Sequence, residues 1–145
     1  MEMPAIYNGL QFKTRLEAQW AAFFDLAKWD WRVNPAPVGD WSPDFRVEFQ
    51  CGHSECSGSH SLLVSVVPVD RIEDAGKHPA LEQRYRIEGP GSEHHKGVNA
   101  GAVFGTSPNA SRFEFAHGAG SGVDDVILWV ENANALWKKA ATLVS

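Results

Sequence analysis

Residues 43–68, PDFRVEFQCGHSECSGSHSLLVSVVP, contain two predicted strands with a loop between them. Apolar and polar side chains alternate through residues 45–49, which is typical of a strand with one buried face. Residues 62–67 form a mostly apolar run that Pro68 ends, as expected of a central strand. Residues 51–61 are rich in Gly and Ser and are predicted to be a loop. The two strands therefore predict the centre of a sheet.

A helix is predicted before these strands, over residues 10–30. Thr14 is a suitable N-cap, and Glu17 three residues later completes the pattern of a capping box. Apolar residues then recur at steps of three and four, which indicates one buried helical face. They are Leu16, Trp20, Phe23, Phe24 and Ala27.

The rest of the chain alternates between strand and helix patterns, without a repeat or an interdomain linker. This order predicts a single α/β (α+β) domain over residues 1–145, with a mixed sheet flanked by helices. The further predicted strands are 29–33, 98–105, 112–117 and 125–131, the helices are 80–87 and 134–143, and the loops are 34–40, 106–110 and 118–122.

Composition limits the classes of function. The formal net charge is −5, whereas proteins that bind nucleic acid through nonspecific phosphate contacts are usually basic. Only a local basic patch is available. No run of about 18 apolar residues and no signal-peptide pattern occurs, so we expect a cytoplasmic protein without a membrane span. The basic candidates are Lys13, Arg15, Lys28, Arg32, Arg71, Lys77, Arg84, Arg86, Lys138 and Lys139.

Several stretches together resemble the PD-(D/E)XK nucleases, the restriction-endonuclease-like superfamily. The resemblance spans most of the chain and implies a restriction-endonuclease-like core, with a mixed central β-sheet flanked by helices. The final stretch resembles the end of a phage and mobile-element group of these proteins. The matching stretches are YNG (7–9), FKTRLEAQWAAFF (12–24), WSPDF (41–45), LLVSVVP (62–68) and LWKKA (136–140).

The resemblance also assigns a site. Glu17 matches the helix-borne Glu of the family's opening motif, and Asp44 after Pro43 matches its metal-binding Asp. Ser65 and Val67 occupy the places of the family's Glu and Lys. Such nucleases hold Mg²⁺ with carboxylates, and Ser and Val supply no ligand charge. The resemblance therefore implies a degenerate site, in a protein that binds nucleic acid or a protein partner.

Two alternatives stay open. One is an active Mg²⁺-dependent DNA nuclease with a rebuilt site, in which another carboxylate joins Glu17 and Asp44. Asp70 follows the central strand and could fold back, whereas Glu48 lies roughly 13 Å along the strand from Asp44. The other alternative is a protein-binding inhibitor or adaptor, which the acidic charge favours. Glu17 as a cap and Asp44 as a turn residue would also have ordinary structural roles.

The predicted loop at 51–61 carries Cys51, His53, Cys56 and His60. Thiolates and imidazoles are the ligands that Zn²⁺ prefers, and four of them close a structural site. The spacing differs from the common zinc fingers, which usually begin with Cys-x-x-Cys. The loop is therefore either a zinc site or an ordinary surface loop with reduced cysteines.

Overall fold

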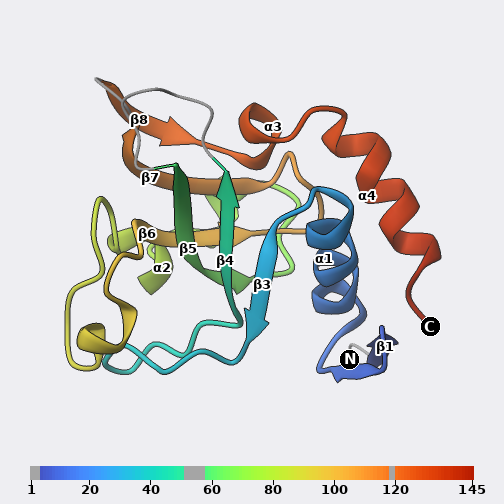
Figure 1. Cartoon of the computed structure of the whole chain (residues 1–145), viewed down its shortest axis with the longest axis horizontal. Helices are drawn as coiled ribbons and strands as arrows, with labels where there is room; N and C mark the ends of the chain where they lie inside the picture. Colours follow the sequence, from blue (N-terminus) through green and yellow to red (C-terminus); the bar gives the residue numbers. More distant parts are fainter. Residues whose placement is uncertain (1–3, 51–57, 118–119) are drawn as a thin grey trace.

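The computed structural model describes residues 4–50, 58–117 and 120–145. These residues form an α+β fold in which helices pack against a mixed six-stranded sheet, ordered β3-β4-β5-β6-β7-β8 (Figure 1). A two-stranded hairpin stands beside this sheet. The strands are β1 (Ala5–Tyr7), β2 (Leu10–Phe12), β3 (Asp30–Val33), β4 (Phe45–Gln50), β5 (Ser59–Val66), β6 (Ala100–Phe104), β7 (Ser111–His117) and β8 (Gly120–Asp124).

The predicted central strands are confirmed as β4 and β5. They are antiparallel neighbours, and β3 pairs antiparallel with the other side of β4. The chain then crosses over through η1 (Ile72–Ala75), α2 (Pro79–Glu82) and η2 (Ser92–His95) to β6, which lies parallel to β5. The strands β7 and β8 complete the sheet in antiparallel fashion. The sheet is mixed because the crossover makes β6 parallel to β5, whereas its other pairs are antiparallel.

The sheet separates two hydrophobic clusters. On one face, Phe45, Val64 and Phe104 pack with α1 (Arg15–Leu26) and α4 (Ala133–Thr142). The fully buried Trp20 of α1 donates from Nε1 to the carbonyl of Gly105 at 2.9 Å, which fastens the helix to the end of β6. On the other face a smaller cluster lies beneath α2. It contains Val38, Trp41, Leu63, Ala80, Val98 and Val103.

The helix predicted at 10–30 is shorter at both ends. Leu10–Phe12 forms β2, because Asn8 and Gly9 take positive φ angles of 50° and 80° and turn the chain into a hairpin. The helix ends at Leu26, and Lys28 then takes a φ of 64° that leads into β3. The predicted N-cap is confirmed, since Thr14 Oγ1 accepts from the Glu17 backbone N–H at 3.1 Å.

Replacing Thr14 with Ala should lower the free energy of unfolding by about 1 kcal/mol, because the first turn of α1 loses its cap. Thr14→Ser keeps the hydroxyl and is the matched control. Urea denaturation followed by circular dichroism measures both variants. Equal losses in the two would show that the methyl group, and not the cap, carries the effect.

Four other predictions differ from the structure. The helix predicted at 80–87 stops at Glu82, and Tyr85, with a φ of 67°, donates its N–H to the carbonyl of Glu114. Residues 125–131 are not a strand. Asp125 caps the short helix α3 (Val126–Trp129) by accepting from the N–H of Leu128. The loops predicted at 51–61 and 118–122 lose their last residues to β5 and β8.

The last predicted helix is confirmed as α4, one residue earlier at each end. It packs on α1, with Trp137 placed 4.5 Å from Trp20 between ring centroids. In the described part of the chain, no helix has the length and apolar character needed to cross a lipid bilayer.

Candidate functional site

Asp44 lies immediately before β4, where it contacts the end of β5. Its backbone N–H donates to the carbonyl of Val64 at 2.7 Å, and its Oδ2 accepts from the N–H of Val66 at 2.8 Å. Asp44 is thus bonded to both neighbours of Ser65, to Val64 through its backbone and to Val66 through its carboxylate. Asp44, directly before β4, therefore lies beside the Ser65 region of β5.

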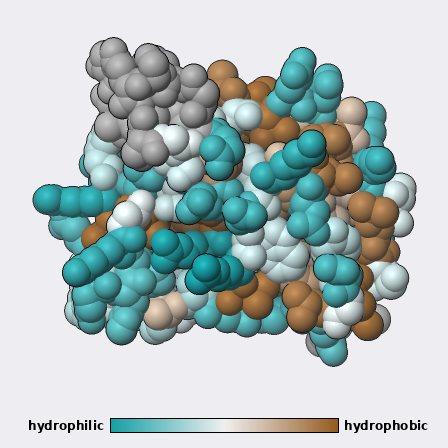
Figure 2. All heavy atoms as spheres, viewed as in Figure 1, coloured by the Kyte–Doolittle hydropathy of each residue, from teal (hydrophilic) through white to brown (hydrophobic). Residues whose placement is uncertain are grey.

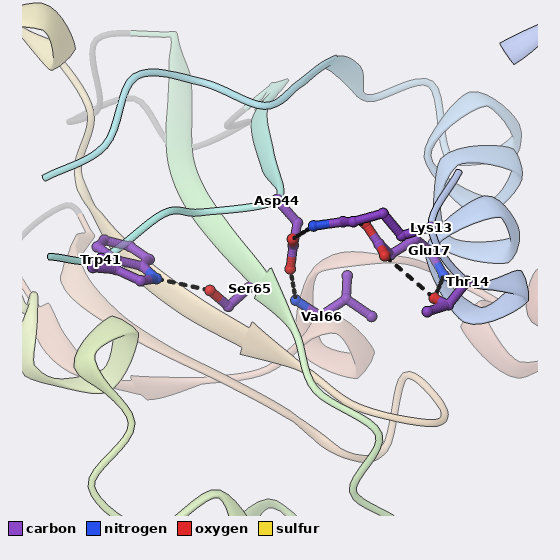
Figure 3. Close-up of polar contacts among 7 residues, drawn as sticks. All are labelled: Lys13, Thr14, Glu17, Trp41, Asp44, Ser65 and Val66. Carbon is purple, nitrogen blue, oxygen red and sulfur yellow. Dashed lines mark hydrogen bonds and ion pairs between the residues drawn. The ribbon is translucent and has the colours of Figure 1, made fainter. Parts of the chain in front are cut away.

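Lys13 occupies the space between the two carboxylates of the predicted site (Figure 3). Its Nζ donates to Asp44 Oδ1 at 3.0 Å and lies 3.9 Å from Glu17 Oε1. Both carboxylates are largely buried, with 15% and 11% of their side chains exposed, while that of Lys13 is 67% exposed. The ammonium group comes from the solvent side and neutralises one of two buried charges.

The local fold explains this placement. Lys13 is the last residue before the cap of α1, and Glu17 lies four residues later, in the first turn. The hairpin of β1 and β2 delivers Lys13 to the position opposite the start of β4. The hydrogen bond to Asp44 raises the pKa of Lys13, and the negative charges of Asp44 and Glu17 raise it further, although partial burial opposes the shift. Lys13 is therefore firmly charged at neutral pH.

Ser65 and Val67 point away from these carboxylates. Residues two apart on a strand share a face, and both belong to the face that carries the smaller cluster. The Ser65 hydroxyl is buried and accepts from Trp41 Nε1 at 2.8 Å (Figure 3). Val67 packs against that same cluster. The two positions therefore contribute to packing beneath α2, while Glu17 and Lys13 lie on the side of α1.

A small cavity of about 100 Å³ borders the carboxylates. Mg²⁺ needs an octahedral shell of oxygen atoms, and proteins supply them mainly from carboxylates. Here one oxygen of Asp44 accepts from the backbone and the other accepts from Lys13. The residues present do not fit a catalytic Mg²⁺. The residues that line the cavity are Leu10, Gln11, Phe12, Lys13, Glu17, Val33, Asn34 and Asp44.

The alternative carboxylates are not brought to this site. Asp70 Oδ1 accepts from Thr106 Oγ1 at 2.7 Å, at the end of β6. Glu48 lies opposite Asp30 on the exposed side of β4. Neither therefore rebuilds a metal site with Asp44 in this arrangement.

Sequence reasoning did not single out His78, which caps α2 by accepting from the N–H of Ala80 at its Nδ1. Partial burial lowers the pKa of His78 from its usual 6.5, and the negative charge of Asp44 opposes part of this shift. A His immediately before a Pro-initiated turn was the available signal.

Acidification should destabilise the protein partly through His78. Because its pKa is lower in the folded state, the unfolded chain takes up a proton first as the pH falls below 6.5, so stability decreases with falling pH. His78→Asn keeps a capping acceptor and removes the titration. Melting temperatures measured between pH 8 and pH 5 should fall less in His78→Asn than in wild type. Parallel curves would contradict this assignment.

Of the predicted zinc ligands, Cys51, His53 and Cys56 lie outside the described residues. His60 is buried on β5, stacked on Phe115 with ring centroids 4.4 Å apart and close to Trp129. Within residues 4–50, 58–117 and 120–145, no group of three or more His, Cys, Asp and Glu residues could hold a metal ion. The zinc site stays a prediction about the loop.

Comparison with known proteins gives no relative whose site could be compared with this one. No family model, no curated protein and no solved structure matches the chain.

Proposed function

We propose that this chain is a restriction-endonuclease-like domain that does not hydrolyse phosphodiesters and serves as a binding module. The order of elements supports the resemblance. A helix, three antiparallel strands, a crossover with α2 and a strand parallel to the third follow one another, from α1 to β6. The Asp44 position at the junction of β4 and β5 also agrees with the family's motif.

The observation that carries the proposal is the contact of Lys13 with Asp44. An ammonium 3.0 Å from the carboxylate supplies the positive charge that a metal would otherwise supply. An ammonium neither polarises a phosphoryl oxygen as a Lewis acid nor lowers the pKa of a bound water, which are the roles of the metal in hydrolysis. Ser65 carries no charge, and its hydroxyl accepts from Trp41 beneath α2.

The surroundings of the site favour a protein partner over nucleic acid, in the phage or mobile-element setting that the resemblance implies. Leu10 and Val33, which line the cavity, are 46% and 37% exposed, so apolar surface borders the ion pair. The net charge of −5 opposes nonspecific binding to phosphates. Protein interfaces bury apolar side chains at their centre, so the exposed Leu10 and Val33 favour a protein partner.

A cleavage assay tests the proposal. Wild-type protein should leave single- and double-stranded DNA and RNA intact with Mg²⁺ or Mn²⁺, and fluorescence anisotropy should show no salt-dependent binding of these polymers. Asp44→Asn is the matched control, because any contaminating nuclease would cleave equally in both preparations. Cleavage by wild type that Asp44→Asn abolishes would establish the rebuilt nuclease instead.

A further inference from the structure

The outer face of β3 and β4 carries no covering layer in the described structure. The segment with α2 covers β5 and β6 on this side, through the cluster that includes Leu63 and Val103. Over β3 and β4, a hollow of about 360 Å³ lies open, lined by Asp30, Trp31, Arg32, Arg46, Val47 and Glu48. Figure 2 shows hydrophilic side chains over the middle of this view, where β3 and β4 lie in Figure 1.

Four charged residues form a square on this face, which we call the charge square: Asp30, Arg32, Arg46 and Glu48. The register places Arg32 directly opposite Arg46, and Asp30 directly opposite Glu48. Opposed residues lie about 5 Å apart, and like charges in such pairs destabilise a sheet. No ion pair of these four residues occurs within the part of the chain that the structure describes.

The alternation of negative and positive charges along each strand limits which molecule can bind the charge square. Along each strand the acidic and basic positions are two residues, about 7 Å, apart. If a nucleic-acid backbone placed one phosphate on the arginine pair, the next phosphate would lie near the acidic pair. The carboxylates of Asp30 and Glu48 would repel that phosphate. The occupant must therefore carry both signs at the same spacing.

We infer that this face binds a second copy of the chain. A two-fold axis running across the strands, midway between the acidic and basic pairs, reverses their order in the second copy. Asp30 then faces Arg32 of the second copy, and Glu48 faces its Arg46, so all eight charges are paired. The surface is self-complementary, as an isologous dimer interface requires.

Charge reversal in two separate proteins tests this inference. Arg32→Glu/Arg46→Glu makes the charge square wholly acidic, and Asp30→Arg/Glu48→Arg makes it wholly basic. Sedimentation at low salt should show a wild-type dimer that dissociates in about 0.5 M NaCl. Each variant alone should be monomeric, with a dissociation constant raised at least about tenfold, and an equimolar mixture should form a heterodimer.

Arg84→Glu/Arg86→Glu is the matched control, since it changes the net charge equally at two exposed arginines elsewhere. It should leave the dimer intact. A wild-type protein that sediments as a monomer at high concentration and low salt overturns the inference, as does a mixture that stays monomeric while both variants retain native circular dichroism. If a variant fails to fold, the wild-type mass and its salt dependence decide. The cleavage assay is independent of all these outcomes.

Discussion

Ser65→Glu, the substitution that introduces the acidic residue of the nucleases that the chain resembles, should lower the free energy of unfolding by about 3–5 kcal/mol. The new carboxylate would lie where the serine hydroxyl now accepts from Trp41, beside the buried Leu63 and Val103. Placing a charge among apolar side chains without a cationic partner carries a penalty of this size. Chemical denaturation measures the loss.

Ser65→Gln is the control for this prediction, because it has nearly the same volume without the charge. It should lose less stability than Ser65→Glu, and the difference should shrink at low pH, where the carboxyl group is protonated. A stable Ser65→Glu protein that gains Mn²⁺ affinity would show instead that the new carboxylate reaches Asp44.

Asp44→Ala should lower the free energy of unfolding by about 1–3 kcal/mol. The partly buried N–H of Val66 loses its acceptor, and Lys13 loses its hydrogen-bonded partner. In a nuclease site kept for metal binding, by contrast, removing a carboxylate relieves repulsion and commonly leaves the fold equally or more stable. The sign of the change therefore distinguishes a structural ion pair from a metal site.

Lys13→Met separates the two contributions. The side chain is 67% exposed, so losing its ion pair alone should cost no more than about 1 kcal/mol. Most of the Asp44→Ala effect should then remain in the Lys13→Met background. If the two substitutions have equal effects, the bond to Val66 contributes little.

The central strands could be predicted because their patterns match their environments. Phe45, Val47 and Phe49 alternate with exposed residues in β4, and the apolar run of β5 is buried on both faces. The boundaries of α1 were predicted less well, although Asn8-Gly9 is a strong hairpin signal at its start. The apolar residues 126–130 suggested a strand, but the cap at Asp125 favours a helix, and periodicity cannot separate short segments of this kind.

The site could be predicted only in part. The resemblance singled out Glu17 and Asp44, which the structure places on either side of Lys13, and strand parity already places Ser65 and Val67 on one common face. Which face packs against α1 depends on the whole sheet. The role of Lys13 depends on a contact with Asp44, 31 residues away in sequence, that the β1–β2 hairpin creates. The only local sign of this role was the position of Lys13 four residues before Glu17, which suits an ion pair between them.

The central claim is that Lys13 takes the place of a metal at Asp44. The most direct test is a titration with Mn²⁺, in which electron paramagnetic resonance measures the free ion. Wild type and Asp44→Asn should bind Mn²⁺ equally weakly, with no saturable site below about 1 mM. Lys13→Met should gain a site that Lys13→Met/Asp44→Asn lacks. Saturable binding by wild type that Asp44→Asn abolishes would contradict the claim.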